Sequence, residues 1–253
     1  MGDFNIKDSE ESVLDDAYKT YKNFEDNLKY GNRFFISEEI NNIFEDVINA
    51  HKENINLNNI LYRARIHDND EDTKPYISSD IGMPPSEFCG VGRLNPKGIR
   101  VFYLAGSREA AVAEVRPNIG NIITIGRFNT IKDMNIVKFQ RKGAVISHKD
   151  EWKCGKSTEF ILYFSTYLSI GFSKIINSKD KELEYLPTQA FAEYCKKLGI
   201  DGISFSSSVY DKCDREGFNK KIKPDYNYVF FNDDGIEFID SELIKIKDIE
   251  YSY

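Results

Sequence analysis

The sequence predicts an α+β fold in which a mixed or antiparallel sheet is flanked by helices. Segments with strand-like alternation outnumber the helical segments along most of the chain. The two kinds of segment do not alternate strictly, as they would in a doubly wound α/β protein. The first fifth of the 253 residues carries only helical periodicity, so a helical N-terminal appendage is expected beside the main domain.

Residues 1–55 are predicted to form this appendage, and residues 56–253 the main domain. Apolar residues recur at helical spacing from Val13 to Leu28, and Gly31 marks the end of that helix. Ser37 is a suitable N-cap for a second amphipathic helix. The Asn-rich run 54–59 is typical of a linker. The pattern is equally compatible with a simple N-terminal extension of one single domain.

The main domain is expected to open with a strand at 61–66 and a long loop rich in glycine and proline. Ser107 is the predicted N-cap of a helix from Arg108 to Arg116, which Pro117 and Gly120 end. Two longer helices are predicted at 158–171 and 187–198, the second with a C-terminal glycine. Further strands are predicted at 100–105, 121–128, 135–139, 203–206, 228–231 and 236–239.

Composition excludes several classes of protein. A net charge of −7 argues against direct nucleic-acid binding, which usually requires a basic surface. The chain has no apolar stretch of membrane-spanning length, and its acidic N-terminus lacks the features of a signal peptide. Its four cysteines and three histidines show no metal-ligand spacing. We therefore expect a cytoplasmic protein with reduced cysteines, no metal and no membrane contact.

Glu114 stands in an unexpected setting. The residues three and four positions before it are Ala111 and Ala110, so this face of its helix should pack closely on the sheet. A carboxylate there costs free energy unless it is paired or faces a cleft. The simpler alternative is that Glu114 lies at the edge of the face and pairs with Arg116, Arg93 or solvent.

Arginines flank the strands around this helix. The planar guanidinium group suits recognition of a diphosphate, because it holds its charge and forms paired hydrogen bonds. Taken singly, each of them could be an ordinary surface residue, Tyr103 could belong to the core, and residues 206–208 could form a plain turn. The arginines concerned are Arg63, Arg65, Arg93 and Arg100.

Seven segments of the main domain follow one another in the order found in a known family. They are Leu61-Tyr62-Arg63, the loop Gly92–Gly98, the strand Val101–Ala105, the helix Ala110–Pro117, Leu186–Gln189, Asp201–Ser207 and Asn227–Phe231. Over about residues 60–231 the chain resembles the RES family of NAD-consuming bacterial toxins. The resemblance implies an ADP-ribosyltransferase-like sheet, since that family shares its fold with ADP-ribosyltransferases of the diphtheria-toxin type.

The resemblance also implies a set of site residues. The Arg, Glu and Ser of the family name match Arg63, Glu114 and Ser207, and the strand tyrosine matches Tyr103; these four are the expected catalytic residues. The second arginine of the family matches Arg93, and the expected substrate-binding residues are Arg93, Arg65, Asn95 and Asn227. Two alternatives remain open: Arg65 competes with Arg63, and Ser206 or Ser208 with Ser207. Leu94 stands where the family usually has an aromatic residue.

The activity implied is degradation of NAD by cleavage of the nicotinamide–ribose bond, through hydrolysis or phosphorolysis. NAD would be a substrate, and no Gly-x-Gly-x-x-Gly motif for a Rossmann crevice is present. The alternatives are an ADP-ribosyltransferase with a protein target and a catalytically inactive binding module. The implied partner is a helix-turn-helix antitoxin, in a toxin–antitoxin or anti-phage setting. The apolar faces of residues 1–55 suit a homo-oligomer, that partner or the main domain equally well.

Overall fold

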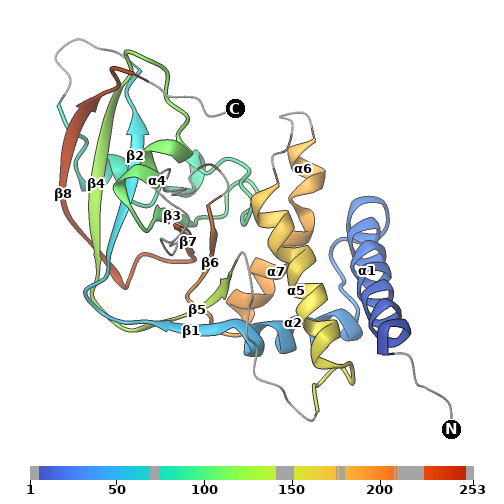
Figure 1. The fold of residues 1–253 in the computed structure, drawn as a ribbon. Helices are drawn as coiled ribbons and strands as arrows, with labels where there is room; N and C mark the ends of the chain where they lie inside the picture. Colours follow the sequence, from blue (N-terminus) through green and yellow to red (C-terminus); the bar gives the residue numbers. More distant parts are fainter. Residues whose placement is uncertain are drawn as a thin grey trace, which may run out of the picture. The chain divides into compact units, whose positions relative to one another are not determined.

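A computed structural model describes residues 6–68, 74–140, 151–174, 176, 180–207, 209 and 225–248 of the chain (Figure 1). These residues fall into two compact units. Unit 1 comprises Met1–Glu53, Val91–Pro96 and Val137–Ile200, and unit 2 comprises Asn54–Gly90, Lys97–Ile136 and Asp201–Tyr253. The expected division at residue 55 stays a prediction. No helix in the described ranges is long and apolar enough to cross a membrane.

Unit 1 is built mainly of helices, which confirms the helices predicted from periodicity. Ser37 caps the second of them as expected, since its Oγ accepts a hydrogen bond from the Ile40 amide at 3.3 Å. Phe44 lies at the centre of the aromatic core, 5.3 Å from the ring of Phe24 and 5.1 Å from that of Phe191. The helices are α1 (Ile6–Tyr30), α2 (Glu38–His51), α5 (Thr158–Ser173), α6 (Lys181–Glu184) and α7 (Leu186–Lys197).

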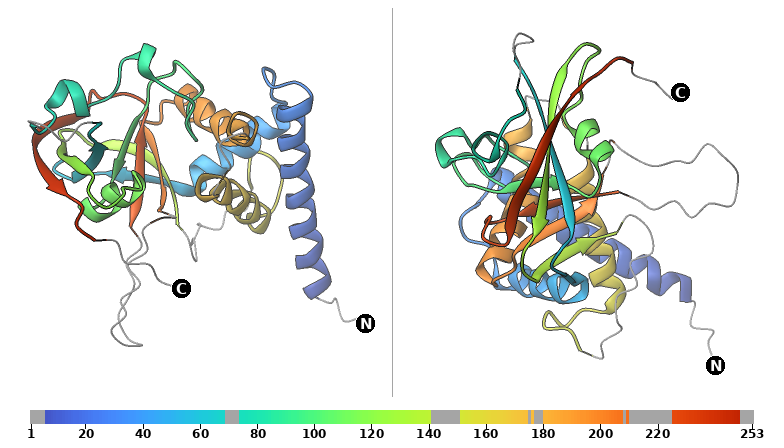
Figure 2. Two further views of the ribbon diagram at one scale, coloured as in Figure 1. Left: turned by 90° about the horizontal axis from the view of Figure 1, so that it is seen from above. Right: turned by 90° about the vertical axis from the view of Figure 1, so that its left-hand side faces the viewer.

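The strands form one eight-stranded sheet in the order β1-β5-β6-β7-β3-β2-β4-β8, which confirms the α+β class. The pairs β2–β3, β2–β4, β3–β7, β4–β8 and β6–β7 are antiparallel. Figure 2 shows β2, β4 and β8 as long neighbouring strands of unit 2. The strands are β1 (Lys52–Ile55), β2 (Ile60–Ile66), β3 (Phe102–Ala105), β4 (Ile122–Thr130), β5 (Met134–Phe139), β6 (Gly202–Ser206), β7 (Tyr226–Phe230) and β8 (Ile236–Lys245).

Several predicted boundaries were wrong. The expected linker begins inside β1, and β8 runs on to Lys245 because it pairs with β4 along its length. The helix predicted to reach Arg116 is α4 (Arg108–Glu114), and it ends early because Arg116 adopts a left-handed backbone with φ of 49°. The long loop contains a short helix, α3 (Ser78–Ile81), and a single 3₁₀ turn, η1 (Ser86–Phe88).

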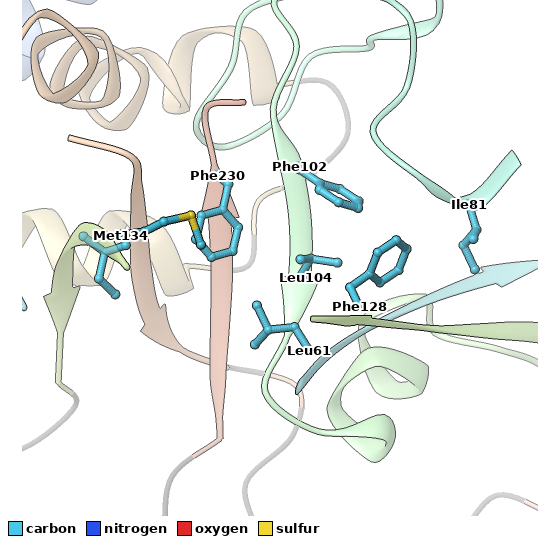
Figure 3. Close-up of a cluster of buried hydrophobic side chains, with 8 residues drawn as sticks. Leu61, Ile81, Phe102, Leu104, Phe128, Met134 and Phe230 are labelled. Carbon is cyan, nitrogen blue, oxygen red and sulfur yellow. The ribbon is translucent and has the colours of Figure 1, made fainter. Parts of the chain in front are cut away.

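Two apolar clusters of unit 2 contain alternate residues of β2, as expected of a strand buried on both faces of a sheet. The first contains Leu61 and Ile81, and Figure 3 shows Phe102 near Phe128 in the same cluster. The second cluster contains Ala64. Small side chains on that face let α4 approach closely, so the sheet has one aromatic face and one face that supports α4.

Candidate active site

Helix α4 holds Glu114 at its last residue. The helix starts at Ser107, whose Oγ accepts from the Ala110 amide at 3.1 Å and also contacts the Asp225 carboxylate. Ala110 and Ala111 are fully or almost fully buried and pack against Ala64 of β2. The alanines predicted to pack on the sheet therefore do so. Glu114 follows them at the C-terminal end of the helix.

The Glu114 carboxylate is fixed by two neutral donors. Its Oε1 accepts from Ser207 Oγ at 2.9 Å and from Asn227 Nδ2 at 2.6 Å. Ser207 and Asn227 are buried, whereas Glu114 itself is exposed. Among the described residues Oε2 accepts no hydrogen bond. One carboxylate oxygen is thus held firmly, while the other has no hydrogen-bond partner in the part of the chain that the structure describes.

Sheet register explains why residues so far apart in sequence meet here. Asn227 of β7 is paired with Ala105 of β3 and with Phe205 of β6. Ser207 follows β6 directly, and its amide donates to the Asp225 carbonyl at 2.9 Å. Because paired residues point to the same face, Asn227 lies on the face where Ala105 packs with α4.

The two described serines of the run 206–208, Ser206 and Ser207, have different surroundings. Ser206 is paired with Tyr226, so the strand alternation directs its side chain away from the face of Phe205 and Asn227. Its hydroxyl is buried and has no hydrogen-bond partner in the described part of the chain. Ser208 lies outside the described residues. Of the serines that the structure describes in this run, Ser207 is the one that contacts Glu114.

Tyr103 lies on the same sheet face as this cluster. It stands two residues before Ala105 in β3, is half-buried, and is paired with Val229. Since alternate residues of a strand share a face, its ring belongs to the side on which α4 packs. Tyr103 therefore lies on the sheet face that supports α4, and its catalytic role stays a prediction.

Arg63 and Arg65 do not join the Glu114 cluster. Both share a face of β2 with Leu61, opposite the face of Ala64. Arg63 donates to the Gly82 carbonyl at 2.9 Å, and Arg65 donates to the carbonyl of residue 80 at 2.7 Å. The two arginines therefore tie the segment around α3 to β2, and the expected convergence of Arg63 on Glu114 is not observed.

Arg63 is nevertheless an unusual cation. Its guanidinium lies 5.5 Å from the centre of the Phe102 ring. Burial, together with the like charge of Arg65, lowers the pKa of Arg63 to about 10. In the described residues no carboxylate forms an ion pair with it. A partly buried guanidinium without an acidic partner is a candidate anion ligand.

Arg93 and Asn95 belong to a loop of unit 1. Arg93 donates to the Lys174 carbonyl at 2.7 Å, and its guanidinium lies 5.5 Å from the Tyr185 ring centre. Asn95 is buried, and its side-chain amide donates to the Pro96 carbonyl at 3.1 Å. Leu94 between them is fully buried, so the residue that replaces the usual aromatic has a packing role.

The same loop is anchored by two residues to which sequence reasoning assigned no role. Thr188 Oγ1 donates to the Arg93 carbonyl at 2.6 Å. Gln189 Nε2 donates to the carbonyls of Gly92 and Asn95, at 2.8 and 3.0 Å. The Leu186–Gln189 motif thus shapes the Arg93 loop from the first turn of α7. Its signal in the sequence was the pair of polar residues following Pro187 at a helix start.

The described residues contain no group of three His, Cys, Asp or Glu side chains able to hold a metal ion. Their three cysteines, Cys89, Cys154 and Cys195, are free. The site as described in unit 2 therefore consists of the fixed Glu114 carboxylate, the Ser207 hydroxyl, the Asn227 amide and the ring of Tyr103 on the same sheet face.

Comparison with known proteins identifies the family. The RES domain profile matches residues 60–252, which is most of the chain. The protein belongs to the RES domain family. A chain in the crystal structure of the M. tuberculosis MbcT–MbcA toxin–antitoxin complex is similar at 12% identity, with a TM-score of 0.45. That match covers 81% of this RES chain and 92% of the other. No curated protein matches the sequence.

Proposed function

We propose that this RES domain protein cleaves the bond between nicotinamide and ribose in NAD, with NAD as a consumed substrate. The observation that carries the proposal is the Glu114 carboxylate: the residue is exposed, Ser207 and Asn227 hold its Oε1, and Oε2 has no partner among the described residues. The family resemblance adds support, because it implies consumption of NAD at the matching residues.

The chemistry explains why a carboxylate held in this way is useful. When the bond breaks, its electron pair passes to the pyridine nitrogen, and nicotinamide leaves as a neutral molecule. Positive charge then develops on the ribose, and a nearby carboxylate stabilises it. Ser207 and Asn227 orient Glu114 without bringing a positive charge, so the negative charge of the carboxylate remains available to the transition state.

The remaining residues have proposed roles in binding. Tyr103 offers an aromatic surface for nicotinamide or ribose on the sheet face of α4. Arg93 is proposed to bind the diphosphate, since its described hydrogen bonds engage only the NH1 group of the guanidinium.

Arg63 and Arg65 are kept as candidate diphosphate ligands, although the β2 pleat turns both away from Glu114. Substitution of Arg63 by lysine tests this part of the proposal. A rise in KM for NAD with an unchanged kcat supports binding by the guanidinium fork. Unchanged kinetics with a lower melting temperature would limit Arg63 to holding the α3 segment on β2.

The biological role follows from the resemblance. We propose that the protein is a toxin that depletes cellular NAD, and that a helix-turn-helix antitoxin neutralises it. Co-expression with a neighbouring gene product of that type tests the pairing: the expected result is restored growth and a stable complex of the two proteins.

The decisive experiment is mass spectrometry of NAD after incubation with the purified protein, with and without inorganic phosphate. Release of nicotinamide with ADP-ribose indicates hydrolysis, and ADP-ribose carrying a phosphate indicates phosphorolysis. Nicotinamide release only when acceptor proteins are added would replace the proposal by protein ADP-ribosylation. Intact NAD under all conditions, from a protein that binds NAD, would leave only an inactive binding module.

A further inference from the structure

Helix α4 is held at both of its ends by one short segment of unit 2, residues 225–227. At the start of the helix, the Ser107 hydroxyl donates to the Asp225 carboxylate. At its last residue, Glu114 accepts from the side-chain amide of Asn227 at 2.6 Å. Residues two apart along extended backbone share a face, which lets both side chains reach the same helix. Since α4 has only seven residues, anchors at both ends fix its position on the sheet.

Ser207 connects the two ends of this arrangement. Its amide donates to the Asp225 carbonyl at 2.9 Å, and its hydroxyl donates to Glu114 Oε1 at 2.9 Å. Asp225 therefore holds a donor of Glu114 through its backbone and the first turn of α4 through its side chain. The contacts form a closed ring that runs from Asp225 through Ser107, the helix, Glu114 and Ser207 back to Asp225.

Both oxygens of the half-buried Asp225 carboxylate are held in place. Oδ2 accepts from Ser107, and Oδ1 accepts from the Tyr226 amide at 2.9 Å. Gly106 lies directly against this carboxylate, and its amide donates to the Tyr226 carbonyl at 2.8 Å. A Cβ atom at Gly106 would lie 2.8 Å from Asp225 Oδ1, which is inside the distance of favourable van der Waals contact. The lack of a side chain at Gly106 therefore lets the carboxylate stay where it accepts from Ser107.

We propose that Asp225 is a positioning residue for Glu114, which it serves by fixing α4 and the Ser207 segment against each other. The inference rests on the proposed cleavage of NAD and assigns Asp225 no contact with the substrate. An ionised acceptor suits this role, because it forms a stronger hydrogen bond with a hydroxyl than a neutral acceptor does. Negative charge is also favourable beside the first turn of a helix.

Two substitutions of Asp225 separate position from charge. Asp225→Ala should lower kcat for nicotinamide release about tenfold, with KM for NAD nearly constant. Asp225→Asn keeps an oxygen that can accept from Ser107 and should retain more of the kcat. Asp234→Ala is the matched control, because Asp234 is an exposed aspartate beyond the other end of β7, and its kcat should equal that of the wild type. Equal losses in the Asn and Ala variants would assign the effect to charge and overturn the proposal, as would an unchanged kcat in Asp225→Ala.

Gly106→Ala tests the same contact without removing a hydrogen-bonding group. Its Cβ atom should displace the Asp225 carboxylate from Ser107 and lower kcat. In the Asp225→Ala background the same Cβ atom meets no carboxylate, so the double variant should be no slower than Asp225→Ala alone. Losses that multiply in the double variant would show that Gly106 and Asp225 act separately, and would overturn the proposal.

The side-chain amide of Asn227 gives a measurement that does not depend on activity. In ¹H–¹⁵N spectra of the full chain without NAD, this amide should have the same shifts in the wild type and Asp234→Ala. It should move in Asp225→Ala and in Gly106→Ala, because its bond to Glu114 is disturbed in both. These shifts in a protein that leaves NAD intact would refute the proposed function alone. An unmoved Asn227 amide in Asp225→Ala would overturn the positioning role, whatever the activity.

Discussion

Two carboxylates of this protein are held by neutral donors, yet in opposite ways. Asp46 of α2 is buried, and each of its oxygens accepts from a backbone amide, Oδ1 from Lys153 at 3.1 Å and Oδ2 from Cys154 at 2.8 Å. Glu114 is exposed, and its two donors, both side chains, converge on one oxygen.

The difference teaches how a structural carboxylate can be told from one available for chemistry. At Asp46 both oxygens accept backbone hydrogen bonds and the residue is buried, so the group joins α2 to the segment before α5 and is not accessible to a ligand. At Glu114 the donors fix the direction of an exposed carboxylate, and its Oε2 has no partner among the described residues. We therefore expect substitutions at the two sites to act on different measurements.

The largest expected effect is on activity, from Glu114→Gln. Glutamine keeps an oxygen acceptor for Ser207 and Asn227 but removes the negative charge that stabilises the ribose cation. Release of nicotinamide from NAD should fall on the order of 10²-fold, with little change in melting temperature. Glu109→Gln is the matched control, because Glu109 is an exposed residue of the same helix, and its activity should be unchanged. Equal activities of both variants would remove Glu114 from the mechanism.

The second effect is on stability, from Asp46→Asn. One amide of the Lys153–Cys154 pair would then face an NH₂ group instead of an acceptor, which should lower the free energy of unfolding by about 1–3 kcal/mol. Thermal unfolding should shift by roughly 2–4 °C for each kcal/mol. Activity per folded molecule should stay at the wild-type level. A variant with normal stability and lost activity would reverse the comparison.

The sequence predicted part of this picture for identifiable reasons. Glu114, Ser207 and Asn227 could be grouped because each stands in a motif of the family, and the structure brings these three together. The alanines before Glu114 predicted close packing of its helix on the sheet, which the second apolar cluster confirms. The first prediction rests on the family resemblance, and the second on the local spacing of the alanines.

The failures concern long-range geometry. Alternation along 61–66 already placed Arg63 and Ala64 on opposite faces of a strand, and small Ala64 marks the face that a helix of alanines can approach. The sequence of residues 61–66 does not show which face of the strand α4 covers. Arg63 was therefore expected beside Glu114. The anchoring of the Arg93 loop by Thr188 and Gln189 joins segments about 95 residues apart, which no local periodicity reveals.

A smaller effect on activity is expected when one donor to Glu114 is removed. Ser207→Ala and Asn227→Leu each leave Oε1 with a single donor, so the carboxylate samples more orientations. We expect kcat to fall about tenfold in each, equivalent to about 1.4 kcal/mol, with KM for NAD nearly constant if the two act as positioning residues. The double variant should lose less than the product of the single losses, because both bonds serve the same oxygen. A change confined to KM would instead assign them to substrate binding.

The smallest expected effect comes from Ser206→Ala, and it sharpens the contrast between adjacent serines. The Ser206 hydroxyl is buried without a described partner, so its removal should leave stability within about 0.5 kcal/mol of the wild type, or raise it slightly. Activity should be unchanged, because the side chain lies on the sheet face opposite Asn227. If Ser206→Ala lost activity while Ser207→Ala kept it, the functional serine would be the one on the other face, and the hydrogen bond from Ser207 to Glu114 would be only structural.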